Sequence, residues 1–368
     1  MTPGAVTGDV SVAFAGIAMV LAPVISKPTV PFGVRVPPER TVAPVIRAQR
    51  RAYACRTTVV AACCMAVALV LPVGAPWWAT RLILLFELAV CLACVQLARR
   101  QITVVKHSEH WFAGHRQAVV ADTGWRASPP RFPVRWLLPA LAVIAATVAI
   151  GLLRYPDLPA RLTLGAGHGV PRSPASAFAP VIGQAYVTAL WTIVLLLVYR
   201  ARPELDAADP AASAARYRAF LARAARAMLT LAACVDLTLL LAGLSVWRLL
   251  RFTGGAAAVE LLPFVAGLCI LGMVIIRTGQ GGFRLSSPVP ARISGRAGTV
   301  PATADRDDDR FWKAGLFYLN RDDPALLVAR RFGAGWTLNF GNRVSWLLIA
   351  ALVATPAGLS AILAALHA

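Results

Sequence analysis

The stretch LILLFELAVCLACVQLARR, residues 82–100, decides the fold of this chain. From Leu82 to Ala98 it contains a single charged side chain, Glu87, and an arginine pair follows at once. A run of about 17 to 25 apolar residues is long enough for a helix to cross a hydrocarbon layer roughly 30 Å thick. A membrane-spanning strand needs only about 9–11 residues and alternates in polarity. The stretch therefore predicts a transmembrane helix that ends at a basic surface.

The same pattern recurs along the 368 residues. We predict eight spans, at residues 10–26, 57–76, 82–98, 136–153, 177–199, 228–250, 256–276 and 344–366. A content of 58% hydrophobic and only 15% charged residues is too apolar for an ordinary soluble protein. The expected fold class is an all-α, polytopic transmembrane helical bundle.

The basic residues give this bundle an orientation. Of the 37 Lys and Arg residues, 31 lie in four alternate gaps, at 27–56, 99–135, 200–227 and 277–343. The positive-inside rule places such gaps in the cytoplasm, so both termini are expected outside. Because the formal charge of +20 flanks the spans, we predict contact with anionic lipids of the cytoplasmic face and no nucleic-acid binding.

Two of the basic gaps contain amphipathic patterns. Residues 42–53 and 211–228 place apolar residues at helical spacing with arginines between them. In the second, Tyr217, Phe220 and Leu221 share one face. We expect helices that lie on the anionic leaflet; a docking site for a regulator is the alternative.

Residues 311–342 are dense in aromatic residues and glycine. Asp322-Asp323-Pro324 predicts a turn or a helix start. We expect a small aromatic-packed module at the cytoplasmic interface, which is either a structural plug or a binding site for a peptide, a nucleotide or a protein partner. The candidate binding residues are Tyr318, Asn320, Asp322, Asp323, Phe332, Gly333, Gly335, Trp336, Asn339 and Phe340.

These module residues resemble a bacterial domain, domain of unknown function 5808. A second resemblance, to domain of unknown function 1648, lies in the outward gap. It rests on Tyr155, Pro156, Asp157, Pro159, Gly167, Gly169 and Pro171. That domain also begins the immunity protein SdpI. The chain departs from its pattern, because Arg172 stands where an acidic residue is expected. Together the resemblances imply a multi-pass protein of the bacterial plasma membrane with no established activity.

The expected organisation follows from the spans and these segments. Residues 1–153 hold four spans and two basic loops, 154–200 the outward loop with one span, and 201–276 an amphipathic helix with two spans. Residues 277–310 form a flexible linker, 311–342 the module and 343–368 the last span.

Two carboxylates fall within predicted spans, Glu87 and Asp236. A charged side chain at the bilayer centre costs about 2.5–3.5 kcal/mol, so each is a candidate proton or cation site. The alternative is that each carboxylate forms a hydrogen bond to another helix and so stabilises helix packing. Possible partners for such bonds are Gln184, Thr188, Thr192 and Thr238.

The remaining candidate chemistry is weaker. His107, Glu109, His110 and His115 follow the third span, but their spacing favours a solvated interfacial helix over a metal site. Cys91 and Cys94 lie inside a span, where they are expected to aid packing. We expect no metal, no cofactor and no enzyme, since no catalytic motif is recognisable.

The sequence therefore favours envelope sensing, immunity or signalling. In this hypothesis the outward loop at 154–176 meets an exported peptide or an envelope condition, and the module acts on a cytoplasmic regulator. The alternative is a secondary transporter or ion-coupled permease that uses Glu87 and Asp236, although no inverted repeat is evident.

Overall fold

The structure is a computed structural model that describes residues 3–71, 76, 78–112, 130–162, 169–201, 203, 210–250, 259–286, 308–352 and 354. Within these ranges, seven helical segments are long and apolar enough to cross a membrane. The helices that they contain are α1 (Pro3–Ile25), α2 (Pro44–Leu69), α3 (Ala79–Ser108), α5 (Leu138–Arg154), α7 (Ala179–Arg200), α8 (Pro210–Val246) and α9 (Leu262–Thr278). The prediction of a helical, multi-pass membrane protein is confirmed at this level.

The eighth span stays a prediction. A shorter apolar helix, Arg343–Leu352, begins it. Of the remaining predicted residues, up to 366, only 354 is described.

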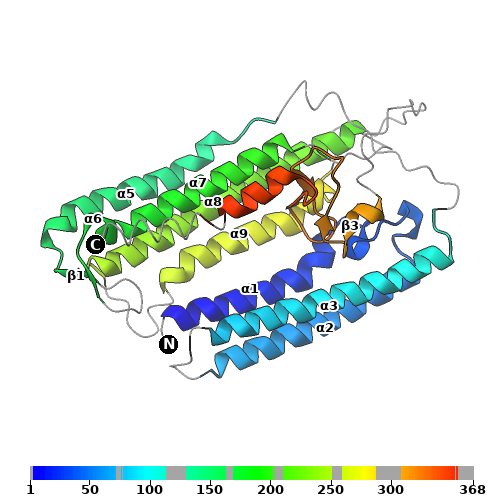
Figure 1. The fold of residues 1–368 in the computed structure, drawn as a ribbon, viewed down its shortest axis with the longest axis horizontal. Coiled ribbons are helices and arrows are strands. Elements are labelled where there is room, and N and C mark those ends of the chain that lie inside the picture. The colour runs from blue at the N-terminus through cyan, green and yellow to red at the C-terminus, as the bar shows by residue number, and fades with distance from the viewer. Residues whose placement is uncertain are drawn as a thin grey trace.

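The helices form two groups (Figure 1). The first group, α1 to α3, packs side by side, and the second contains α5, α7, α8 and α9. Between the groups, α1 meets α9. The guanidinium of Arg284, just beyond α9, joins them further by donating to Ile276 O at 2.6 Å and to Val24 O, in α1, at 2.7 Å.

The two ends of the bundle differ. At one end, called here the basic end, the C-termini of α1, α3 and α9 meet residues 308–342, called here the C-terminal module (Figure 1). At the opposite end, called the loop end, side chains from the described parts of residues 155–178 pack around Trp247, just after α8. Successive helices alternate in direction between these ends, as the charge pattern predicts.

The prediction of two separate helices that lie on the membrane surface is wrong. Residues 44–53 are the first turns of α2, and residues 210–228 are the first turns of α8, so each continues directly into its span. Tyr217, Phe220 and Leu221 do share an apolar face, but that face is buried against protein. The helical periodicity correctly identified a face that leaves water. Protein covers this face where lipid was predicted, and Leu327 and Trp336 of the module are part of that cover.

The C-terminal module consists of two short antiparallel hairpins. Strand β3 (Trp312–Lys313) pairs with β4 (Phe317–Tyr318), and β5 (Leu327–Ala329) pairs with β6 (Trp336–Leu338). Of the turn predicted at residues 322–324, the structure shows a bend at Arg321 and Asp322, and the strand β5 follows. The helix start predicted there is therefore wrong, because the polar network described below fixes the turn and leads the chain into β5.

The loop end is also ordered by a short hairpin. Strand β1 (Arg161–Leu162) pairs with β2 (Val170–Pro171), and the one-turn helix α6 (Pro174–Ala177) follows, capped by Ser173. Leu158, Leu162 and Ala177 surround the indole of Trp247, which is 1% exposed. The indole nitrogen donates to Ala177 O at 2.9 Å.

Candidate functional site: the C-terminal module at the basic end

Buried polar side chains hold the C-terminal module together. Asn339 is fully buried, and its amide nitrogen donates to Asn320 O at 2.8 Å and Asp323 O at 2.9 Å. Its amide oxygen accepts from Asn320 N at 3.1 Å. The hydroxyl of Tyr318 donates to an Asp323 carboxylate oxygen at 3.1 Å. These predicted binding residues therefore fix the two hairpins against each other, since buried polar groups are stable only when they are paired.

A second set of predicted residues contacts the first helix group. The ring of Phe332 stacks on Phe32, with centroids 5.8 Å apart, and meets Tyr53 edge-on at 6.2 Å. The backbone nitrogen of Gly333 donates to Ser26 Oγ at 2.7 Å. Gly33 approaches the module so closely that a Cβ there would lie 2.6 Å from Gly315 O. The module is thus packed directly onto the 26–33 segment and α2.

A third set contacts the second helix group. Trp336 donates its indole hydrogen to Tyr217 Oη at 3.2 Å, and its ring lies 5.9 Å from that of Phe220. Both partners belong to α8. Gln280, just after α9, accepts from Gly335 N and donates to Gly335 O, each at 2.8 Å. The module therefore links both helix groups at the basic end.

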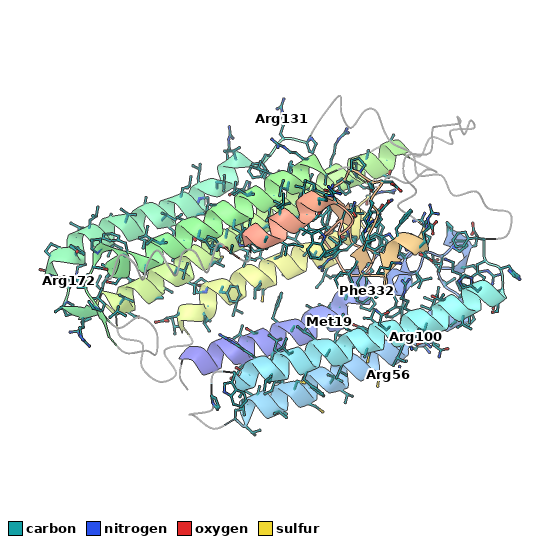
Figure 2. All side chains as sticks on the ribbon, viewed as in Figure 1. Met19, Arg56, Arg100, Arg131, Arg172 and Phe332 are labelled. Atoms are coloured by element: carbon teal, nitrogen blue, oxygen red, sulfur yellow. The ribbon has the colours of Figure 1, made fainter. Side chains whose placement is uncertain are left out.

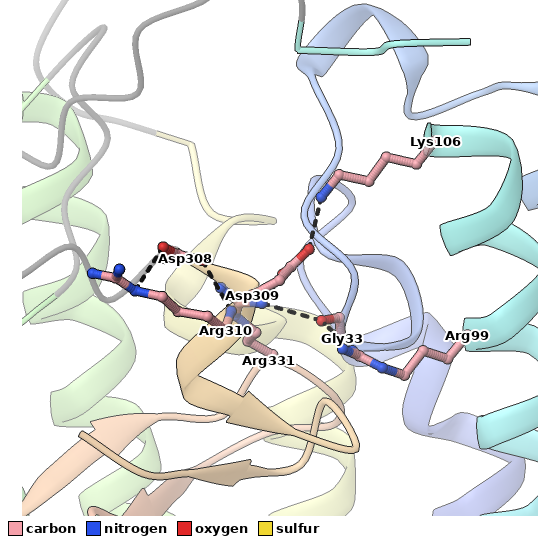
Figure 3. Close-up of polar contacts among 7 residues, drawn as sticks. All are labelled: Gly33, Arg99, Lys106, Asp308, Asp309, Arg310 and Arg331. Carbon is pink, nitrogen blue, oxygen red and sulfur yellow. Dashed lines mark hydrogen bonds and ion pairs between the residues drawn. The ribbon is translucent and has the colours of Figure 1, made fainter. Parts of the chain in front are cut away.

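An ion cluster of Lys106, Asp309 and Arg331 strengthens this junction (Figure 3). Asp309 pairs with Lys106 of α3 at 2.7 Å and with the guanidinium of Arg331. Arg331 is 6% exposed and also donates to Gly33 O at 3.3 Å, while Arg99 donates to the same oxygen at 2.9 Å. Burial disfavours a charge on Asp309, but the charges of Arg331 and Lys106 outweigh burial and hold the pKa of Asp309 below its usual value.

Sequence reasoning did not single out this cluster. Asp309 lies in residues 277–310, for which the sequence predicts a flexible linker, and Lys106 and Arg331 lie in basic gaps, for which it predicts contact with anionic lipids. No local pattern distinguishes an arginine that faces lipid from one that faces a buried aspartate.

The intramembrane carboxylates have different surroundings. Asp236 is fully buried and accepts from Thr188 Oγ1 at 2.7 Å. Gln184 donates to Asp236 O at 2.8 Å and to Thr147 Oγ1 at 2.9 Å, so α5, α7 and α8 share one polar cluster. Of the predicted partners, Gln184 and Thr188 take part.

The other predicted partners do not join this cluster. Thr192 and Thr238 donate to carbonyls of their own helices, and Thr147 had not been predicted. Glu87 is buried beside Gly16 of α1, and both of its carboxylate oxygens lack a hydrogen bond within the described residues.

The predicted outward-loop residues line the loop end. Tyr155, Pro156 and Asp157 form a 3-10 turn, and Pro171 lies in β2; Pro159 and Gly169 flank the hairpin, and Gly167 lies outside the described residues. Arg172 donates to Leu158 O at 2.6 Å. The arginine that stands in place of the expected acid thus holds the loop backbone.

The interfacial helix predicted for His107, Glu109, His110 and His115 does not continue through His110. Helix α3 ends at Ser108, and His110 lies in a turn with φ of 48°; His115 is outside the described residues. Glu109 pairs with Arg40 at 3.2 Å. In the part of the chain that the structure describes, no group of three or more His, Cys, Asp or Glu residues is placed to hold a metal ion.

Comparison with known proteins places one family on this module. The family described as "Family of unknown function (DUF5808)" matches residues 321–346. This supports the resemblance of the C-terminal module over a short part of the chain. Comparisons with curated proteins and with solved structures found no match. The resemblance of the outward loop to domain of unknown function 1648 stays a prediction.

Replacing Phe332 tests the junction between the module and the first helix group. Phe332→Ala removes a buried ring from the Phe32–Tyr53 contact, and we expect the free energy of opening of the module to fall by about 3–5 kcal/mol. Amide hydrogen exchange of residues 327–338 in detergent measures this. Phe317→Ala is the matched control, because Phe317 is 52% exposed in the same module. Equal effects in the two variants would contradict the assigned contact.

Replacing Asp309 tests the ion cluster. Asp309→Asn leaves the buried Arg331 without its counter-charge, so we expect a loss of about 2 kcal/mol at pH 7. Because the folded-state pKa is lowered, the stabilisation is complete above the ordinary aspartate pKa of about 4 and disappears as the pH falls through the lower folded value. The gap in unfolding temperature between wild type and variant should therefore close below about pH 4.

Asp308→Asn controls for the loss of a negative charge. Asp308 pairs at 2.9 Å with Arg310, whose side chain is 70% exposed. Exposed pairs contribute about 0–1 kcal/mol, so this variant should stay near wild type at every pH. A pH-independent gap for Asp309→Asn would show that the ion cluster does not stabilise the junction.

Proposed function

We propose that this protein is a signal relay of the bacterial plasma membrane. A ligand or condition outside the cell acts on residues 155–178, and the C-terminal module passes the resulting state to a cytoplasmic partner. This proposal rests on one observation, the continuity of helix α8. It extends without a break from Pro210 to Val246 and contacts a different functional segment near each end.

The length of α8 suits a relay. At 1.5 Å per residue, its 37 residues extend for about 55 Å, more than the thickness of the hydrocarbon core. Just beyond its C-terminus, Trp247 is enclosed by the loop-end residues. Near its N-terminus, Tyr217 and Phe220 contact Trp336 of the module. A displacement of the loop around Trp247 would therefore move the surface on which the module rests.

The contacts of the module suit a response to such a displacement. Its docking on the second helix group includes the aromatic contact of Trp336 with Phe220 and the hydrogen bonds of Gln280 with Gly335. Interfaces of this kind have discrete arrangements and switch between them rather than deform gradually. In the proposal, release from α8 exposes the face of Trp336 to the partner.

The charge distribution supports the orientation of the relay. The module and the basic gaps lie at the same end of the bundle, which the positive-inside rule assigns to the cytoplasm. Helix α1 begins near Thr80, at the opposite end. The proposal therefore places the N-terminus and the loop end outside, and the same alternation would bring the last span to the outside as well.

A transporter is the second candidate, and one observation favours it. Asp236 Oδ1 and Gln184 Oε1 are buried and have no hydrogen-bond partner among the described residues. Two unpaired oxygens in one polar cluster are suited to a proton or a small cation. The cluster lies within the second helix group alone.

Replacing Trp247 tests the relay. Trp247→Leu empties part of the loop-end core without touching the module, some 45 Å away along α8. We expect amide exchange of residues 327–338 to accelerate by about tenfold, while exchange in α2 stays unchanged. Hydrogen exchange with mass spectrometry in lipid nanodiscs measures both segments.

Trp78→Leu is the matched control for this experiment. Trp78 precedes α3 at the same end of the bundle, is 50% exposed and lies outside α8. It should leave exchange in the module unchanged. If Trp247→Leu accelerates exchange only within residues 155–178 and 240–250, the two ends are not coupled and the relay is wrong.

Replacing Asp236 tests the transporter. Asp236→Asn keeps an acceptor for Thr188 but can no longer bind and release a proton or neutralise a cation. Proteoliposomes with an internal pH-sensitive dye should show no proton or Na⁺-driven flux for wild type above protein-free vesicles. A wild-type flux that Asp236→Asn abolishes and Thr192→Val preserves would favour transport over the relay.

A further inference from the structure

A hollow opens where the C-terminal module passes into the last helix. Its volume is about 630 Å³. It is lined by Arg321, Asp323, Pro324, Phe340, Gly341, Asn342, Arg343 and Trp346. All eight residues fall within the segment 321–346 that the family match covers. The matched segment therefore contains every residue that lines this hollow.

The hollow lies where the helix changes from polar to apolar surroundings. Arg343 begins the apolar helix 343–352, and Val344, Trp346 and Leu347 are 46%, 56% and 69% exposed. The indole nitrogen of Trp346 donates to Phe340 O at 3.0 Å, so its ring lies beside the hollow. Tryptophan prefers the level of the lipid head groups, which places the hollow at that level.

The accessible charge of the hollow is positive. Arg321 and Arg343 are both exposed, and neither forms an ion pair within the described residues. The lining acid, Asp323, is 2% exposed, and its two oxygens accept from the Tyr318 hydroxyl and from Ala325 N. Its carboxylate is therefore buried and hydrogen-bonded within the module, whereas both arginines are exposed.

The backbone amides at the start of the helix are not the binding groups. Asn342 Oδ1 accepts from Val344 N at 2.9 Å, and Ser345 N donates to Asn342 O at 3.1 Å. The side-chain nitrogen of Asn342 donates to Pro324 O at 3.2 Å. Recognition of an anion is left to the two guanidinium groups, whose planar donors suit phosphate oxygens.

We propose that this hollow binds the head group of an anionic phospholipid. Arg321 and Arg343 contact the phosphate, and the acyl chains follow the exposed apolar side chains Val344 and Leu347. A lipid fits better than a soluble phosphate compound, because the lining residues Arg343 and Trp346 are each followed in the helix by an exposed apolar residue, Val344 and Leu347. The volume lies within the range of about 300–1,000 Å³ typical of ligand sites.

Lipid titration of the full-length protein tests this site. The protein in neutral detergent is titrated with phosphatidylglycerol or with phosphatidylcholine. We expect saturable binding of phosphatidylglycerol that is about 30-fold weaker in Arg321→Gln/Arg343→Gln, at about fivefold for each arginine. Phosphatidylcholine should bind weakly to both proteins.

A second pair of arginines provides the matched control. Arg56→Gln/Arg100→Gln removes the same charge from exposed positions on α2 and α3 (Figure 2). It should change the affinity by no more than about twofold. Equal weakening in the two double variants would overturn the proposal, since binding would then depend on total charge alone.

Two further readouts locate the lipid. Phosphatidylglycerol with brominated acyl chains should quench tryptophan fluorescence more than its phosphatidylcholine counterpart, and Trp346→Phe should remove this difference. An unchanged difference would place the lipid elsewhere.

Displacement by glycerol phosphate at the same concentration would show that the site selects a soluble anion, which overturns the lipid assignment. Unfolding temperatures in neutral detergent should be equal in all variants, which excludes misfolding as the cause.

Discussion

The contact of Phe332 with Phe32 and Tyr53 is the point on which the arrangement of the two helix groups depends. Helices surrounded by lipid gain little from the hydrophobic effect when they associate, so close packing and polar bonds must hold them. Among the described residues, the main direct helix contact between the groups is that of α1 with α9. The module adds an aromatic contact to one group and the Trp336 contact to the other. A segment outside the spans thus determines how the spans are arranged.

The sequence predicted the spans well because the bilayer imposes a length that composition alone reveals. It predicted the amphipathic faces of residues 42–53 and 211–228 but assigned them to the wrong partner. Helical periodicity records that one face leaves water, and it does not record whether lipid or protein covers that face. The sequence did not predict the two hairpins of the module, for a related reason. Each strand has only two or three residues, too few to show an alternating pattern.

Residues of the candidate site could be predicted only where their side chain is unusual for the sequence around it. Asp236 was recognisable because a carboxylate is unusual in an apolar span, and Gln184 and Thr188 followed as its possible partners. Thr147 gave no such signal, since a threonine is unremarkable in a transmembrane helix. Asp309 lay in a polar segment where acids are common. Its role depends on Arg331 and Lys106, which are 22 and 203 residues away along the chain.

The basic residues show how one charge pattern can serve three purposes. By the positive-inside rule, the excess of Lys and Arg in alternate gaps predicts the orientation of the chain, whatever each side chain contacts. Lys106, Arg99 and Arg331 then contact the protein and join the module to the first helix group. Arg321 and Arg343 are exposed at the start of the last helix, where we propose a lipid phosphate as their counter-charge. Counting charges therefore predicts topology, whereas the function of each charge follows only from the residues that the fold places beside it.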